Sequence, residues 1–78
     1  MRDYAEDISL AELFGLKPED YSEVDVLSLP FYIRVINRFR QKQINTVRDL
    51  LQVDITFLKG IYGLGATSLS EILSFCES

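Results

Sequence analysis

Two glycines one residue apart, Gly63 and Gly65, constrain the fold of this chain more than any other feature. Glycine adopts positive φ angles without a steric penalty, so either residue allows a tight turn here. The apolar Leu64 between them can fill the space between two helices. Apolar residues at helical spacing precede and follow the turn, first at Ile55, Leu58 and Ile61 and then at Leu69, Ile72, Leu73 and Cys76. The pattern therefore predicts a helix, a glycine turn and a second helix, which together form a helix-hairpin-helix.

The same turn offers a surface that an anion can approach. The second helix is expected to begin just after Gly65, and the first N–H groups of a helix have no partner within it. These N–H groups are expected to point outward, and Gly65 has no Cβ that would stand in the way of a ligand. The positive end of the helix dipole favours a phosphate at this position. The alternative is a purely structural turn in a small helical bundle that binds nothing. The local sequence leaves both interpretations open.

Length and composition limit the classes of function. The 78 residues predict a single small domain with a real hydrophobic core, because 47% of them are hydrophobic. One cysteine, Cys76, and no histidine exclude a disulfide framework, Cys/His zinc sites and histidine-based catalysis. No nucleophile with a base and no phosphate loop with its lysine is found, so we expect no enzyme, no cofactor and no small-molecule substrate. Without a membrane-spanning run or a signal peptide, we expect a cytoplasmic location.

Charge is distributed unevenly along the sequence. The net charge of −4 argues at first sight against nucleic acid as a partner. However, residues 1–25 hold eight acidic and two basic residues, a balance of −6, and residues 26–78 have a balance of +2. Most of the positive charges lie between Arg34 and Arg48. The total charge therefore does not exclude DNA binding by the second part of the sequence.

The acidic N-terminal segment, residues 1–25, is predicted to contain one short helix. Ser9 and Glu12 have the spacing of a capping box, so we expect a helix that runs to about Leu16. Its apolar face is formed by Leu10, Leu13 and Phe14. The segment can pack on the rest of the protein through this face. An interaction arm and the tail of a preceding domain are the open alternatives.

A longer amphipathic helix is predicted from Pro30 to about Gln41, after an extended stretch from Val24 to Leu29. Ser28 is placed to cap this helix, and proline is tolerated in a first turn. The residues expected to face a core are Phe31, Ile33, Ile36 and Phe39. The opposite face carries a polar stripe formed by Arg34, Asn37, Arg38 and Gln41. Such a stripe is most often a solvated helix face.

The remaining helices are short. Thr46 is expected to cap one of them, a helix that has Asp49 at its third position. Asp54 is expected to cap the helix that follows. The last helix is expected to run from just after Gly65 to Phe75 or Cys76. We therefore predict an all-α fold, a compact bundle of four to five short helices that ends in the helix-hairpin-helix and has an extra short N-terminal helix.

Three blocks of the sequence resemble the C-terminal domain of the bacterial RNA polymerase α subunit. They are IRVINRF at residues 33–39, INTVRDLL at residues 44–51 and GLGATSLSEI at residues 63–72, in the right order and near the right spacing. The resemblance runs from about Leu27 to Phe75, roughly two thirds of the sequence. It implies a small bundle ending in a helix-hairpin-helix, and it assigns residues 26–78 to a domain of this kind, preceded by the acidic segment.

The resemblance also implies a DNA-binding surface, because in that family the domain docks on the minor groove. The arginine and asparagine of the first long helix correspond to Arg34 and Asn37. The hairpin glycine, serine and glutamate correspond to Gly65, Ser68 and Glu71. The candidate DNA-contacting set is completed by Arg38, Gly63 and Ala66. An arginine in a narrow A·T-rich minor groove, with the N–H groups of the hairpin on a phosphate, would form a coherent mechanism.

Two departures from the family pattern lower the expected affinity. The family usually has lysines just after the hairpin glycine, whereas this sequence has Ala66 and Thr67, which removes attraction for phosphates. Arg38 and Arg40 can partly restore it. The acidic segment lies outside the resemblance and can repel DNA if it folds near the same surface. Binding is therefore expected to be weak and sensitive to salt.

The expected function is that of a weak, A·T-preferring DNA-binding module related to transcription, within a larger protein or assembly. Its partners would be DNA and other transcription-apparatus proteins, without a membrane. The alternative is a protein-interaction module of the same fold, or a SAM-like bundle, that does not bind DNA. The acidic segment and the missing lysines fit that alternative.

Overall fold

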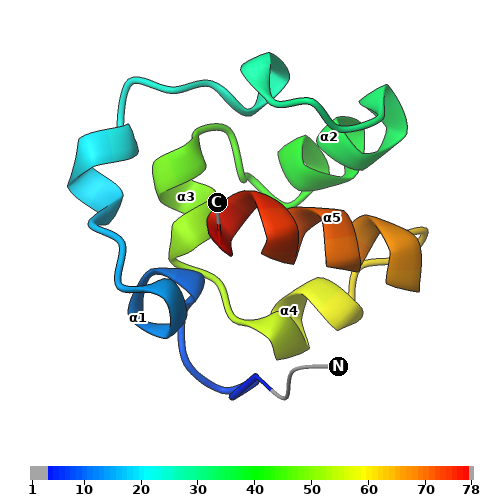
Figure 1. Cartoon of the computed structure of the whole chain (residues 1–78). Helices are drawn as coiled ribbons and strands as arrows, with labels where there is room; N and C mark the ends of the chain where they lie inside the picture. Colours follow the sequence, from blue (N-terminus) through cyan, green and yellow to red (C-terminus); the bar gives the residue numbers. More distant parts are fainter. Residues whose placement is uncertain (1–3, 78) are drawn as a thin grey trace.

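The computed structural model describes residues 4–77, and in this part of the protein the regular structure is entirely helical. Figure 1 shows the five α-helices, which are α1 (Leu10–Phe14), α2 (Ile33–Gln41), α3 (Val47–Leu51), α4 (Ile55–Lys59) and α5 (Ala66–Glu77). Two short 3₁₀ helices, η1 (Pro18–Tyr21) and η2 (Val26–Ser28), connect α1 to α2. The predicted all-α bundle with a short N-terminal helix is confirmed.

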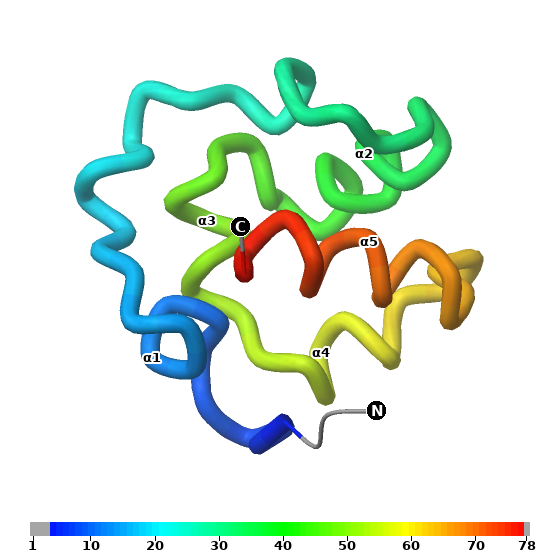
Figure 2. The backbone as a smooth tube through the Cα atoms, in the orientation of Figure 1, coloured from blue at the N-terminus to red at the C-terminus, as the bar shows by residue number. Residues whose placement is uncertain are grey.

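The longest helix, α5, runs across the molecule between α2 and α4 in the view of Figure 1. The trace in Figure 2 shows that the connection from α1 to α2 passes around the outside of α3, and η1 packs against α3. Each α-helix contributes one side chain with no exposed surface to a common core, namely Leu10, Phe39, Leu50, Leu58 and Ile72. Full burial of such a side chain is worth roughly 1.5–3 kcal/mol, so this core holds the short helices together.

Side-chain caps define the starts of the shortest helices, each of which has only five residues. Helices of this length are unstable in isolation. The Ser9 hydroxyl accepts from Glu12 N, and the Asp54 carboxylate accepts from Phe57 N at 2.7 Å. Thr46 and Asp49 form a complete capping box. The caps predicted at Ser9, Thr46 and Asp54 are confirmed. Only the end of α1 differs, because Gly15 turns the backbone at φ 68° directly after Phe14, before the expected Leu16.

The start of α2 was predicted wrongly. The helix begins at Ile33 and not at Pro30, and Tyr32 at its N-cap makes no side-chain cap bond. Ser28 lies in η2, where its hydroxyl donates to Asp25 O at 2.7 Å, so it is not available to cap α2. The stretch expected to be extended therefore contains a helical turn, which the Asp25 carboxylate caps through Leu27 N at 2.8 Å.

The set of core-facing residues in α2 also differs from the prediction at one position. Ile33 is 63% exposed, because it occupies the first residue of the helix at the edge of the bundle. Val35 is buried in its place, beside the correctly predicted Ile36 and Phe39. Phe31 lies outside the helix but is half-buried, with its ring 6.4 Å from that of Phe39 and 5.8 Å from that of Phe75. Phe31 thus links the entry of α2 to α5.

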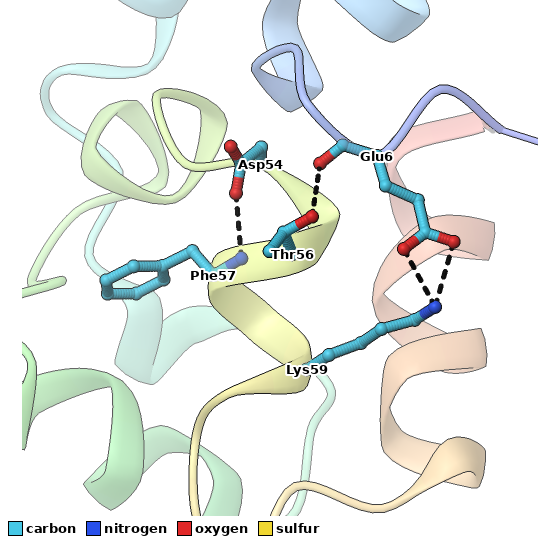
Figure 3. Close-up of polar contacts among 5 residues, drawn as sticks. All are labelled: Glu6, Asp54, Thr56, Phe57 and Lys59. Atoms are coloured by element: carbon cyan, nitrogen blue, oxygen red, sulfur yellow. Dashed lines mark hydrogen bonds and ion pairs between the residues drawn. The ribbon is translucent and has the colours of Figure 1, made fainter.

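The N-terminal segment packs on the rest of the protein through its apolar face and its backbone. Leu10 is fully buried, and its N–H donates to Val53 O at 2.9 Å. Figure 3 shows Glu6 against α4, where its carbonyl accepts from the Thr56 hydroxyl at 3.0 Å and its carboxylate lies 2.8 Å from Lys59 Nζ. Of the three possibilities left open by the sequence, packing is the one observed for residues 4–25.

Candidate nucleic-acid interface

The hairpin between α4 and α5 is built around one glycine with positive φ. Gly63 has φ 86°, and Leu64 N donates to Ile61 O at 3.2 Å across the turn. Ile61 is buried and Leu64 packs against the core, as expected for a residue between two helices. Gly65 does not have positive φ, and a Cβ at this position would meet nothing within 4 Å. Of the two glycines at which the sequence allowed positive φ, only Gly63 therefore adopts it.

Arg38 brings the polar stripe of α2 into contact with this turn. Its guanidinium carbon lies 5.4 Å from the centre of the Tyr62 ring. A Cβ on Gly63 would stand only 3.1 Å from Arg38 Nε, so the arginine crosses the turn where glycine leaves the backbone bare. Arg38 Nη1 also donates to Gln41 Oε1 at 3.3 Å. The stripe on α2 and the glycine turn consequently form one continuous surface.

The other residues of the stripe are exposed on the same face of α2. Arg34 and Asn37 precede Arg38 by four positions and one position, which places all three on one side of the helix. The guanidinium of Arg34 lies 5.5 Å from the centre of the Tyr32 ring. Within residues 4–77 neither Arg34 nor Arg38 makes an ion pair. Their positive charge is therefore available to an anionic ligand.

The N-terminus of α5 completes the surface. Leu69 N makes its helical bond to Gly65 O at 3.0 Å, so the N–H groups of Ala66, Thr67 and Ser68 come before the first helical bond. Ala66 and Thr67 are exposed. The Ser68 residue, in contrast, is only 7% exposed. Its hydroxyl is largely covered. The backbone N–H of Ser68 is therefore better suited than the side chain to contact a phosphate.

A groove connects the entry of α2 with the first turns of α5. Its lining includes Tyr32 on one side and Ala66, Thr67 and the half-buried Glu71 on the other. The groove therefore brings the predicted Ala66 and Glu71 of α5 beside the N-cap of α2, whereas the predicted residues of α2 itself do not line it. All eight candidates lie on α2, the hairpin turn or the first turns of α5, and Ser68 is the one whose side chain the fold largely covers.

Two tyrosines belong to this surface but were missed from the sequence. Tyr32 and Tyr62 are both exposed, and each carries an arginine over its ring. The spacing of Tyr32 and Arg34, an aromatic residue two positions before a basic one, was a usable signal. No local signal pairs Tyr62 with Arg38, because the two residues are 24 positions apart.

Other chemistry is not apparent in the described part of the protein. Cys76 is buried, and burial raises the pKa of its thiol to about 11, which keeps it protonated. Among residues 4–77, no group of three or more His, Cys, Asp or Glu side chains is arranged to hold a metal ion. None of the helices in the same range has the length and apolar character needed to cross a membrane.

The fold and the site define a small all-α domain that ends in a helix-hairpin-helix beside an exposed basic helix face. A family model for the C-terminal domain of the bacterial RNA polymerase alpha subunit matches residues 15–77, and this protein belongs to that family. The family is a non-catalytic, transcription-related DNA-binding domain. No curated protein and no solved structure was found to match the sequence. The resemblance seen in three blocks of sequence is confirmed, and the match leaves out α1 and the residues before it.

Proposed function

We propose that this protein binds duplex DNA weakly, in the minor groove and with a preference for A·T-rich sequence. It acts without catalysis, within a larger protein or assembly of the bacterial transcription apparatus in the cytoplasm. Membership of the family supports the class of function. The observation that carries the proposal is the contact of Arg38 with the hairpin turn, because it joins the stripe of α2 to the N-terminus of α5.

In this proposal the face of α2 supplies the groove contacts. Arg34 is exposed and makes no ion pair within residues 4–77, and an arginine is attracted into a narrow A·T-rich groove by its enhanced negative potential. Asn37 lies on the same side of the helix and can hydrogen-bond to base edges or sugars. Because the minor groove distinguishes mainly A·T from G·C pairs, the expected selectivity is for base composition and groove width.

The start of α5 supplies the phosphate contact. Gly65 carries no side chain, a Cβ there would meet nothing, and the N–H groups of the following residues lack helical partners. The 12 residues of α5 give this end a helix dipole that favours an anion. A phosphate next to Ala66 would therefore be held by backbone groups, without the lysines of the family pattern.

The N-terminal segment leaves the stripe on α2 accessible. Its polar side chains contact α4, through Glu6 and Lys59, and the far end of α5, where Tyr4 donates to Glu77 at 3.1 Å. Its backbone bonds to Val53 and to Val47 of α3. Arg34 and Asn37 stay exposed. The acidic charge of this segment still lowers the attraction for DNA over a distance of about 10 Å at moderate salt. Tethering to a larger assembly would raise the effective concentration of so small a module.

An amide chemical-shift titration tests the proposal. The ¹⁵N-labelled protein is titrated with a short A·T-rich duplex and with a G·C-rich duplex of equal length, at low and at higher salt. We expect shifts on α2 and residues 63–68 that are larger with the A·T-rich duplex and fade with salt. Arg34→Ala should remove them, whereas Arg48→Ala, which deletes the same charge from α3, should not. Absence of shifts at low salt would contradict the proposal.

A protein-interaction function of the same fold is favoured by one observation. Leu27, Tyr32 and Ile33 are large apolar side chains that are exposed around the entry of α2. Exposed apolar groups of this kind can mark a protein-binding site. If this surface binds a transcription-apparatus protein and not DNA, Ile33→Ser should weaken that complex, while Arg34→Ala has little effect.

A further inference from the structure

We infer that Tyr62 and Arg38 act together as a clamp on the phosphodiester backbone of duplex DNA, beside the hairpin turn. This inference rests on the proposed function and adds Tyr62 to the residues that carry it. The clamp is defined by three side chains and one glycine. Tyr62 and Gln41 flank the guanidinium of Arg38, and Gly63 provides the bare backbone that the arginine crosses.

The position of Tyr62 does not suit a structural role. The residue is 84% exposed at the tip of the hairpin, between the buried Ile61 and Gly63. A tyrosine with so little buried surface contributes little to the core. The ring is nevertheless placed under a charged group that is itself half-buried. A planar apolar surface held at the edge of a basic face is suited to a ligand that has both charged and apolar parts.

Arg38 is constrained on several sides before any ligand binds. The Tyr62 ring lies 5.4 Å from its guanidinium carbon, Gln41 accepts one of its N–H groups at 3.3 Å, and a Cβ on Gly63 would crowd Nε at 3.1 Å. A long side chain normally loses rotamer freedom when it binds, and this loss is smaller when the side chain is already fixed. Only one of the five N–H donors is used by Gln41, so a bidentate contact with an anion is possible.

DNA backbone fits this combination of groups. A guanidinium binds phosphate oxygens through paired N–H donors, and the exposed Tyr62 ring can pack on the adjacent deoxyribose. The location also fits, since the turn leads directly into the exposed and uncharged Ala66 and Thr67, so the first residues of α5 carry no positive side chain. Arg38 returns a positive charge to this part of the surface from another helix. The pair of Arg38 and Tyr62 thus supplies attraction for a phosphate that the uncharged start of α5 does not supply through side chains.

Fluorescence anisotropy with a labelled, short A·T-rich duplex at low salt tests the clamp. The variants are Tyr62→Ala, Tyr62→Phe, Arg38→Ala, Arg38→Lys and the double variant Arg38→Ala/Tyr62→Ala. We expect Tyr62→Ala and Arg38→Ala each to raise Kd about threefold to tenfold, which corresponds to the loss of one aromatic–guanidinium contact and its phosphate. Tyr62→Phe should stay within about twofold of the original protein, because the ring carries the contact.

Coupling between the two residues is the decisive part of the test. Because Tyr62 holds Arg38 in addition to packing on the sugar, the double variant should lose clearly less affinity than the sum of the two single losses. Arg38→Lys should lose part of the affinity although it keeps the charge, since an ammonium is neither planar nor bidentate. Phe57→Ala removes an exposed aromatic ring from α4, and Arg48→Ala removes a charge from α3. Both controls should leave Kd unchanged.

The outcomes separate this inference from the proposed function. If the original protein binds the duplex and Arg34→Ala abolishes binding, but Tyr62→Ala binds as the original does, the clamp is refuted and the proposed function stands. Fully additive losses in the double variant would also refute it. If the original protein does not bind at low salt, the proposed function fails and the clamp with it. Circular dichroism melts identify any variant that has lost its fold, and Tyr62→Phe and Arg38→Lys then carry the comparison.

Discussion

Arg38 crosses the backbone at Gly63 so closely that a Cβ on the glycine would stand 3.1 Å from Arg38 Nε. Gly63 also has φ 86°, an angle that residues with a side chain rarely adopt. Two separate requirements, a backbone angle and a close approach, therefore meet at one position. Gly65, two residues later, has neither requirement.

The two glycines of the hairpin should respond differently to the same substitution. Gly63→Ala is expected to lower the free energy of unfolding by about 1–2 kcal/mol, because alanine is disfavoured at positive φ. For a domain of this size that corresponds to a fall in Tm of roughly 4–16 °C. Gly65→Ala is the matched control and should change Tm by much less. Equal losses in the two variants, measured by thermal circular dichroism, would contradict this account of the turn.

The difference between the glycines also changes an expectation drawn from sequence. The pattern of two glycines around Leu64 predicted the hairpin correctly, but it did not distinguish which glycine takes positive φ. Only the folded backbone, in which Leu58 and Ile72 on either side of the hairpin both lie in the core, shows that Gly63 is the one. Because Gly65 lacks positive φ and a Cβ there would meet nothing within 4 Å, the fold is expected to tolerate a substitution at this position.

Local sequence predicted the caps and the final helix well, for a physical reason. A cap such as Asp54 with Phe57 N joins residues three positions apart, so both partners are visible in one short stretch. The start of α2 was missed for two reasons, a distant ring contact and a local turn that competes for the expected cap. Phe31 packs between Phe39 and Phe75, and Ser28 is taken up by its bond to Asp25.

The residues of the candidate site also fall into two groups, those that local sequence predicts and those that only the fold brings together. Helical spacing places Arg34, Asn37 and Arg38 on one face, so the stripe could be predicted from sequence. The tyrosine at the tip of the hairpin could not, since only the fold brings Tyr62 to Arg38. The covered hydroxyl of Ser68 likewise follows from packing between helices and not from its neighbours in the sequence.

The capping box of α3 should make stability depend on pH. Hydrogen bonds from the backbone of Asn45, and then from Thr46, lower the pKa of Asp49 below its ordinary value of 3.8 in the folded protein, against an opposing effect of burial. A carboxyl with a lowered folded pKa stabilises the fold above the unfolded pKa, and this contribution is lost as pH falls through the folded value.

Asp49→Asn should therefore be less stable than the original protein near neutral pH, and this difference should shrink as pH falls below 3.8. Urea unfolding at several pH values measures it. Glu19→Gln, a neutralising change at an exposed carboxylate of η1, serves as the control. A difference between Asp49→Asn and the original protein that stays constant with pH would contradict the role given to this carboxylate.

The buried thiol of Cys76 should be unreactive in the folded protein. Its pKa is raised to about 11 by burial, so the thiolate that reacts with disulfide reagents is scarce at mildly alkaline pH. We expect reaction with an aromatic disulfide to be slow in buffer and fast in guanidinium chloride. Rapid reaction without denaturant would mean that the end of α5 opens readily from the core.

The N-terminal segment should contribute to stability through its apolar face more than through its charges. Leu10 is fully buried, and Leu10→Ala is expected to cost about 2–5 kcal/mol. Glu6 and Lys59 form an ion pair in which both side chains are about half exposed, 47% and 52% respectively. Solvent screening makes such a pair worth less than about 1 kcal/mol, so Glu6→Gln should have a small effect.

Urea unfolding of these two variants, followed both by far-ultraviolet circular dichroism and by tyrosine fluorescence, provides the measurement. Tyr4 and Tyr21 lie in the N-terminal segment and pack against the core, so the fluorescence includes a signal from this part of the protein. If the segment unfolds together with the bundle, both signals change at one midpoint, which Leu10→Ala lowers and Glu6→Gln barely moves. A Leu10→Ala midpoint equal to that of the original protein would show that α1 adds nothing to the core. The acidic segment would then be better described as an arm that rests on α4.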